Sequence, residues 1–250
     1  MIPYSKQFID NDDIYYIRKA TYPSNAGCTS IRMIDSLGNM LDSWNLDPIT
    51  NRMTTQMEYS MGHIYISYTA FPGSGYDARL IKTNINTHIN TLIKELYTAD
   101  YDSGKFSINA NGSILWNATS TGNPATNYLY LFDSFGNEVW QYDHVPNEFS
   151  LMDIECSGNN YLVATDQFQT GIIFNQLHKT FYHSPNPFAF EINEAGEIVD
   201  AFAHNIMGNA TGYEIEVKDG VVYYVYRTEA SFFNNGVRQE PGVYVVKGCN

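Results

Sequence analysis

The sequence predicts an all-β protein built from five similar units, and three observations indicate this fold class. First, an apolar segment, a polar turn and an aromatic-rich segment recur about every 50 residues, a spacing typical of repeat architectures. Second, these segments are rich in β-branched and aromatic residues, and helical periodicity is nearly absent. Third, four of the five turns carry a glycine, namely Gly62, Gly112, Gly158 and Gly220. We therefore predict a five-bladed β-propeller of four-stranded antiparallel blades.

Each unit divides into four strands, A to D in chain order, and its first hairpin supplies strands A and B. In these hairpins an apolar segment precedes the polar turn, and a segment rich in tyrosine and β-branched residues follows it. Such residues suit the pleated, half-buried surface of a blade. The predicted A–B hairpins span residues 8–17, 57–66, 106–116, 152–163 and 213–225.

The second hairpin of each unit, made of strands C and D, carries its own turn signal. Asp35 and Asp133 can accept hydrogen bonds from backbone amides two residues further on, while Gly38 and Gly136 suit the left-handed conformation of a tight turn. Residues 193–196 repeat the pattern in the fourth unit. These turns lack the alternating oxygen ligands of an EF-hand, so we predict that they shape the chain rather than bind calcium.

The five predicted blades fill a single domain, residues 1–250, and blade five has only strands A to C. We expect residues 1–5 to close blade five, with residues 2–5 paired to residues 243–246, because an open edge leaves backbone groups unpaired. Alternatively, this edge accepts a strand from another chain. An insertion, residues 167–186, separates strands B and C of blade four. The blades span residues 6–46, 55–96, 105–143, 150–202 and 213–247.

Two segments carry a family resemblance. Residues 31–44 (IRMIDSLGNMLDSW) and 128–140 (YLYLFDSFGNEVW) resemble blades of the PQQ-like and arylsulfotransferase-like propeller repeats. The resemblance extends over the whole chain as a repeat and implies a five-bladed propeller. Blades of this kind occur in lectins, hydrolases, electron-transfer enzymes and scaffolds, so the resemblance does not imply one activity.

Composition opposes several classes of partner and site. A net charge of −13 and a pI near 4.7 disfavour binding to nucleic acid and to anionic lipid. No apolar run approaches the roughly 20 residues of a membrane span, and the first residues lack the apolar core of a signal peptide. We therefore expect a soluble protein. The 3 cysteines and 6 histidines are scattered without zinc-ligand spacing, so we predict no metal site and no cofactor.

The B–C and D–A connections of a propeller leave from one end of the blades, and here they include the longest loops. Long loops on a rigid scaffold concentrate binding residues, and these loops mix aromatic with small polar side chains, which suits sugar rings and protein epitopes. Because the five loops differ in length and sequence, we favour one protein or glycan ligand over five equal sugar sites. Alternatively, the aromatic residues pack under their own loops. The candidate ligand-binding residues are Tyr22, Phe71, Tyr76, Phe174, Phe181, Tyr182, His183, Phe232 and Phe233.

Carboxylates on the A strands suggest an alternative function. Strand alternation can direct some of them toward the central channel, where clustered carboxylates could hold a cation or, as an acid and base pair, hydrolyse a glycoside. A solvated channel is the simpler explanation of the same residues. The sequence has no GxSxG elbow and no phosphate-binding glycine loop, so we assign no catalytic residue. The A-strand acids are Asp10, Glu58, Asp153, Glu155, Glu214 and Glu216.

The sequence thus favours a non-catalytic propeller that recognises a protein or a glycan through its loop-rich end, or that serves as a structural component of a larger assembly. The acidic composition, rich in asparagine and tyrosine, would suit an accessory or receptor-binding component of a virion. The competing class is a glycoside hydrolase that uses the A-strand carboxylates.

Overall fold

The computed structural model shows an all-β chain whose strands are paired in antiparallel sheets. It describes residues 8–9, 15–20, 29–46, 52–70, 75–97, 101–120, 126–144, 149–167, 171–174, 177–180, 186–203, 210–228, 231–234 and 237–247. The chain forms two compact units, Met1–Gly104 and Lys105–Asn250.

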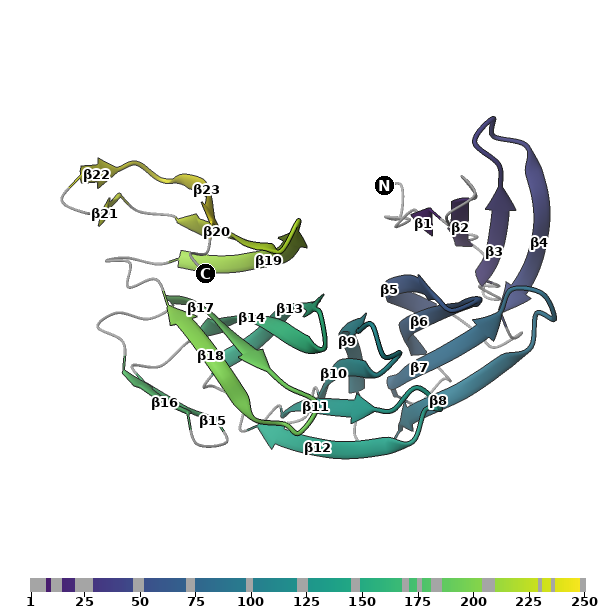
Figure 1. Cartoon of the computed structure of the whole chain (residues 1–250), viewed down its shortest axis with the longest axis horizontal. Coiled ribbons are helices and arrows are strands. Elements are labelled where there is room, and N and C mark those ends of the chain that lie inside the picture. The colour runs from purple at the N-terminus through teal and green to yellow at the C-terminus, as the bar shows by residue number, and fades with distance from the viewer. Residues whose placement is uncertain are drawn as a thin grey trace. The chain divides into compact units, whose positions relative to one another are not determined.

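The first unit contains two four-stranded antiparallel sheets, which are blades one and two (Figure 1). In both sheets the strands follow one another in chain order, as expected for a propeller blade. Blade one consists of β1 (Phe8–Ile9), β2 (Tyr15–Ala20), β3 (Thr29–Ile34) and β4 (Met40–Leu46). Blade two consists of β5 (Arg52–Ser60), β6 (His63–Ala70), β7 (Asp77–Asn84) and β8 (Asn90–Leu96).

The other three blades follow in the same way, and blade three begins in the last residues of the first unit. Blade three is β9 (Tyr101–Ile108), β10 (Ile114–Ser120), β11 (Asn127–Phe132) and β12 (Glu138–His144). Blade four is β13 (Phe149–Ser157), β14 (Asn160–Gln167), β17 (Asn186–Ile192) and β18 (Ile198–Ala203). Blade five is β19 (Ala210–Lys218), β20 (Val221–Thr228) and β23 (Gly242–Lys247). The prediction of five antiparallel blades is confirmed. The predicted closing segment, residues 2–5, lies outside the described residues.

The B–C connections of blades four and five each contain an additional hairpin. In blade four it is β15 (Gly171–Phe174) paired with β16 (Leu177–Thr180), and in blade five it is β21 (Phe232–Asn234) paired with β22 (Val237–Gln239) (Figure 1). The sequence places the first insertion between strands B and C correctly, but it does not predict either hairpin. The Asn-Gly pair at positions 235 and 236, a strong signal for a two-residue hairpin turn, could have indicated the second one.

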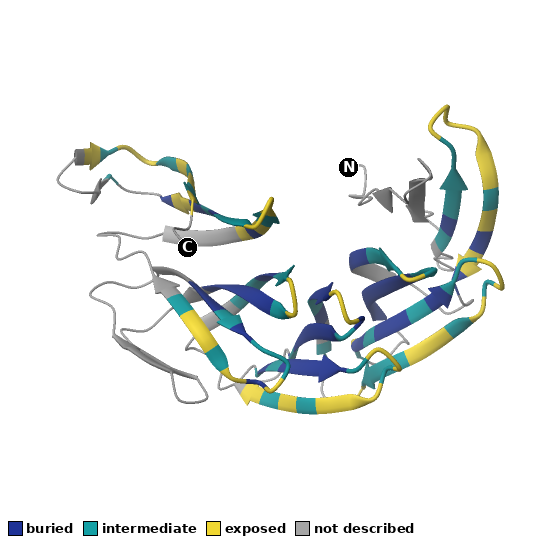
Figure 2. Cartoon of the chain, in the orientation of Figure 1, coloured by how far each residue is buried: buried dark blue, intermediate teal, exposed yellow. Residues whose placement is uncertain are grey.

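Packing between neighbouring blades forms the cores, and in blades two to four the middle strands are buried on both faces (Figure 2). On β14, Tyr161 and Val163 belong to a cluster with side chains of blade three, whereas Leu162 and Ala164 pack with Ile215 of blade five. Alternate residues of a strand point to opposite faces, so one strand contributes to two cores. In the first unit, side chains of blades one and two share a comparable cluster.

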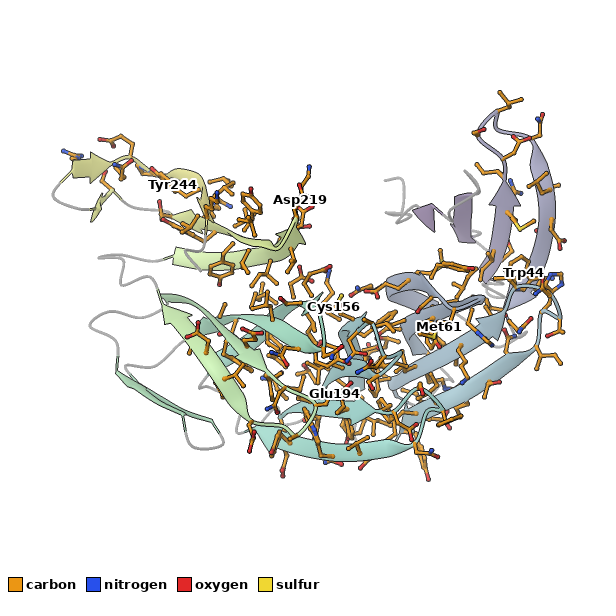
Figure 3. All side chains as sticks on the ribbon, in the orientation of Figure 1. Trp44, Met61, Cys156, Glu194, Asp219 and Tyr244 are labelled. Atoms are coloured by element: carbon orange, nitrogen blue, oxygen red, sulfur yellow. The ribbon has the colours of Figure 1, made fainter. Side chains whose placement is uncertain are left out.

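Strand D of one blade also contacts the C–D turn of the next. In the first unit, Trp44 of β4 stacks on His88, with ring centroids 4.3 Å apart, and Asp42 Oδ2 lies 3.1 Å from His88 Nε2. In the second unit, Trp140 of β12 donates a 2.9 Å hydrogen bond from Nε1 to the carbonyl oxygen of Glu194, which lies in the turn between β17 and β18 (Figure 3). The blades are therefore joined by directed contacts as well as by apolar packing.

The aspartate turns have the predicted structural role. Asp35 Oδ1 accepts hydrogen bonds from the amides of Leu37 at 3.0 Å and Asn39 at 2.8 Å, and Oδ2 accepts one from Asn39 Nδ2 at 2.8 Å. Asp133 makes the same three contacts in blade three. The hydrogen bonds from the asparagine side chain and backbone lower the pKa of both carboxyls. Each carboxylate is thus held by its own turn.

Candidate functional site

The candidate site is the end of the blades from which the B–C and D–A connections leave, here called the loop-bearing end. In an antiparallel blade, strand B ends where strand C begins, and this is also the end at which strand D finishes. In the described structure the B–C connections of blades four and five carry the added hairpins, and that of blade two carries Tyr76. Where the structure describes them, the A–B and C–D connections at the other end of the blades are short turns.

The structure describes one of the predicted side chains, Tyr76, which is 41% exposed. For Phe174, Phe232 and Phe233 it gives the backbone, in the hairpin strands β15 and β21. The backbone of Phe232 pairs with Gln239 and that of Phe233 with Arg238. The remaining candidates, Tyr22, Phe71, Phe181, Tyr182 and His183, lie outside the described residues. The sequence-based site thus remains a prediction, apart from the exposure of Tyr76.

The loop-bearing end of blade two carries a group of residues that we call the blade-two rim: Tyr76, Asp77, Arg79, Glu95 and Tyr97. Tyr76 and Tyr97 are both exposed, at 41% and 67%. The amide of Tyr101 donates a 2.7 Å hydrogen bond to the carbonyl oxygen of Tyr76, which ties the B–C connection to the start of β9. The two exposed tyrosines therefore flank a part of the blade whose backbone is fixed.

The charged residues of the rim form an ion-pair cluster on strands β7 and β8. Arg79 Nη2 lies 3.3 Å from Asp77 Oδ2 and also contacts Glu95 Oε1. Burial opposes the charge of Arg79, but a hydrogen bond with Tyr68 and the nearby carboxylates outweigh it and raise its pKa. Arg79 is thus a permanent cation beside two acids, and the cluster carries one excess negative charge when both acids are ionised.

Buried hydroxyl groups behind the rim bind blade two to the beginning of β9. Ser67 Oγ donates to the carbonyl oxygen of Gly104 at 2.7 Å and lies 2.5 Å from Ser103 Oγ. The amide of Ser103 donates to Thr69 Oγ1 at 2.9 Å. Because buried hydrogen bonds are costly to break, these contacts restrict movement beneath the rim.

Two of the A-strand acids make structural contacts. Asp153, which is 8% exposed, accepts a 3.2 Å hydrogen bond from the amide of Ile215 and lies 3.7 Å from Lys105 Nζ, so it connects blade four with blades three and five. Glu58 accepts a 2.6 Å hydrogen bond from Gln56 Nε2 on the same strand. Of the other acids, Glu155 is half-buried, Glu214 and Glu216 are exposed, and Asp10 lies outside the described residues.

Within the described part of the chain, no group of three or more histidine, cysteine, aspartate or glutamate residues could hold a metal ion. Cys156, on β13, is half-buried and forms no disulfide. The described residues also include no helix that could cross a membrane.

Of the five rim residues, the sequence analysis names only Tyr76 as a candidate for ligand binding. Arg79 stands opposite Glu95 in the β7–β8 ladder, and this pairing register is needed to see that the two charges meet. A weak signal was present, because Asp77 and Arg79 are two residues apart in an apolar strand and so share one face.

Comparison with known proteins gives the fold and no family. No protein-family model matches the chain, and no curated protein is significantly similar in sequence. Among solved structures it resembles the hydrazine synthase of Kuenenia stuttgartiensis, with 13% identity, a TM-score of 0.57 and coverage of 88% of this chain and 62% of that one.

Two further structures are similar to a comparable degree. The polysaccharide lyase Uly1 is 11% identical, with a TM-score of 0.60 and coverage of 98% of this chain and 57% of that one. An oligogalacturonate lyase in complex with manganese is 10% identical, with a TM-score of 0.57 and coverage of 96% of this chain and 64% of that one. This chain spans less than two thirds of the length of all three. At such low identity the likeness supports the propeller fold alone.

Proposed function

We propose that this propeller is a non-catalytic binding module that recognises a protein or a glycan through its loop-bearing end. The observation that carries the proposal is the difference between the B–C connections. Those of blades four and five contain a hairpin each, whereas that of blade two is short and leads to an exposed tyrosine. A lectin with five equal sugar sites would repeat one loop, so unequal loops on a repeated scaffold favour one protein or glycan ligand over five equal sites.

The contacts of the A-strand acids support a binding role over a catalytic one. A catalytic carboxylate must have an oxygen available for the substrate. Asp153 instead holds the amide of Ile215 and lies near Lys105, and Glu58 accepts a hydrogen bond from Gln56. We infer that both carboxylates mainly position the A strands.

Two finer parts of the proposal rest on the sequence. The blades belong with the PQQ-like and arylsulfotransferase-like repeats through the similarity of residues 31–44 and 128–140. A place in a larger assembly, such as a virion accessory or receptor-binding component, rests on the acidic, asparagine-rich composition.

The alternative is a glycoside hydrolase-like enzyme. The observation that favours it is the position of Glu155, Glu214 and Glu216 on β13 and β19, where they are half-buried or exposed. Glycosidases use pairs of carboxylates about 5 to 9.5 Å apart.

The experiment that separates these functions measures binding and cleavage of the same oligosaccharide panel. We expect binding without product, and loss of binding to the sugar or to a protein partner when Phe181, Tyr182 and His183 are all changed to alanine. A change in surface loops leaves the blade cores intact, so thermal unfolding should be nearly unchanged. Product formation that Glu58→Gln or Asp153→Asn abolishes would show that the protein is an enzyme.

A further inference from the structure

We propose that the blade-two rim is a subsite for a neutral saccharide. This proposal rests on the proposed function and names the ligand for one part of the loop-bearing end. The rim combines exposed aromatic rings with a partly buried guanidinium and two carboxylates. The proposal follows from the register of the strands, the exposure of the two tyrosines and the charge of the cluster.

Strand register places Tyr97 beside the charged cluster. In the β7–β8 ladder, Arg79 is opposite Glu95 and Ala78 is opposite Leu96. Continuing the register by one residue puts Tyr97 opposite Asp77, and directly opposed residues of an antiparallel pair share one face. Tyr97 therefore belongs to the face of Asp77, Arg79 and Glu95, whereas Tyr76 lies one residue before Asp77 and belongs to the other face.

The exposure of the tyrosines gives the rim an aromatic surface. Tyr97 is 67% exposed and Tyr76 is 41% exposed, although Tyr65 and Tyr68 in the same blade are buried. Tyrosine offers an apolar ring with a polar tip, and the CH face of a sugar ring can lie against such a ring while its hydroxyls stay hydrogen-bonded. Tyr97, which shares the face of the charged cluster, therefore supplies the stacking half of a saccharide site.

The cluster supplies donors and acceptors for sugar hydroxyls. A guanidinium has five N–H donors, and Arg79 uses the same nitrogen, Nη2, for both carboxylates. The side chains of Arg79 and Glu95 keep 15% and 28% of their surface exposed. Neighbouring hydroxyls of a sugar can donate to a carboxylate and accept from a guanidinium at one site.

The charge of the cluster selects a neutral sugar over an acidic one. Arg79 is already neutralised by two acids, which leaves one negative charge in the rim of a chain whose net charge is −13. An acidic sugar would meet repulsion from both the rim and the whole molecule. A neutral sugar has no such cost, and its binding should depend little on salt.

The test titrates the full chain with short neutral gluco-, galacto- and manno-oligosaccharides, followed by calorimetry and saturation-transfer NMR. At least one of them should bind, and an oligogalacturonate of the same length should bind more weakly. Tyr97→Ala should weaken binding by about tenfold, the scale of one lost aromatic anchor, and Tyr97→Phe by no more than about threefold. Glu95→Gln, which removes a charge but keeps the shape, tests the polar half and should also weaken binding.

Phe135→Ala serves as the matched control, because Phe135 is 83% exposed and lies in the C–D turn of blade three, at the other end of that blade. It should bind like the wild type. If no neutral sugar binds, or if Tyr97→Ala and Glu95→Gln bind as tightly as Phe135→Ala, the subsite is wrong. The proposed function fails separately, when a bound sugar is cleaved. If binding is lost only when Phe232 and Phe233 are changed to alanine, the proposed function stands and the subsite is wrong.

Discussion

Gly196 illustrates how one residue connects two blades. It lies in the turn between β17 and β18 with a φ of +80°, a conformation that other residues rarely adopt. A Cβ at this position would lie 2.8 Å from Tyr142 Oη and 3.3 Å from Trp140 Cε2, both on the last strand of blade three. Glycine is therefore required here by the backbone and by the neighbouring blade.

We predict that Gly196→Ala destabilises the protein by about 1 to 3 kcal/mol more than Gly38→Ala does, the range for overpacking a tight contact. Gly38 is the matched control, because it has a similar φ of +85° in the equivalent turn of blade one, and a Cβ added there would have nothing within 4 Å. Urea unfolding of both variants gives the difference. Equal losses would mean that backbone strain alone matters and that the contact with Tyr142 does not.

Glu194 makes stability depend on pH. Its Oε1 accepts hydrogen bonds from Asn109 Nδ2 at 2.6 Å and from Asn111 Nδ2 at 3.3 Å. The hydrogen bond from Asn109 is the main cause that lowers the pKa of Glu194. A carboxyl whose pKa is depressed by folding contributes stability above its unfolded pKa, about 4.3, and loses it as the pH falls through the folded pKa.

We therefore expect the urea midpoint to fall on acidification below about pH 4.3, with Asp35 and Asp133 contributing in the same direction near their unfolded pKa of about 3.9. Glu194→Gln should be less stable than the wild type at pH 7 and should lose less on acidification, because glutamine does not titrate. Urea midpoints of the wild type and of Glu194→Gln, measured from pH 7 to pH 3, give the pH dependence of stability for each protein. Parallel curves for the two proteins would contradict this role of Glu194.

At the residue scale, the sequence predicted contacts that are local and missed those that need the fold. The roles of Asp35 and Asp133 follow from neighbours two and four residues away, so the sequence contains all the partners. Arg79 and Glu95 are far apart in the sequence and meet only through the register of β7 and β8. Charged residues in strands usually face solvent, and nothing in the sequence distinguished this pair from that common case.

At the scale of elements, strand β14 shows why blades depend on their neighbours. Its side chains alternate between a cluster shared with blade three and a cluster shared with blade five. We predict that Leu162→Ala, at a residue 1% exposed, costs about 2 to 5 kcal/mol in unfolding free energy. Leu37→Ala, at a residue 86% exposed, should stay within about 0.5 kcal/mol of the wild type. Similar unfolding midpoints for the two variants would contradict the double-faced core.

Asp153 provides a test of how strands β13 and β19 are joined. Its carboxylate accepts the amide hydrogen of Ile215, and the residue is 8% exposed. We expect Asp153→Asn to cost about 1 to 3 kcal/mol, because the weakened contact leaves a buried polar group poorly paired. Glu214→Gln, at an exposed position on β19, should leave the unfolding midpoint unchanged. If Asp153→Asn is equally harmless, the carboxylate is not a structural contact and its assignment must be reconsidered.

The hairpins β15–β16 and β21–β22 mark the limit of prediction at this scale. The main strands repeat along the chain, so each occurrence supports the others. The added hairpins occur once each, in loops of different length, and have only short strands of 3 or 4 residues. Segments of that length are ambiguous by periodicity, so the sequence alone does not distinguish them from loops.

At the scale of the whole molecule, repetition made the architecture predictable and the function difficult to predict. Five similar units fix the class of fold, and the blades observed in each compact unit agree with it. The binding that we propose depends on the parts that do not repeat, namely the B–C connections and the pairing of charges at the blade-two rim. We predict that residues 1–250 form a single domain. The unfolding transitions followed by near-ultraviolet and by far-ultraviolet circular dichroism should then coincide, as they do for one cooperative unit.

Whether the propeller binds or cleaves its ligand is decided by following binding and product formation together, on one sample of the full chain with the oligosaccharide panel. We predict a saturable complex and no product, with binding weakened in Tyr97→Ala or in the double variant Phe232→Ala and Phe233→Ala, while the unfolding midpoint stays that of the wild type. Release of shortened sugars, lost in Asp153→Asn or Glu58→Gln at unchanged unfolding midpoint, would contradict a binding role and assign the A-strand carboxylates to catalysis.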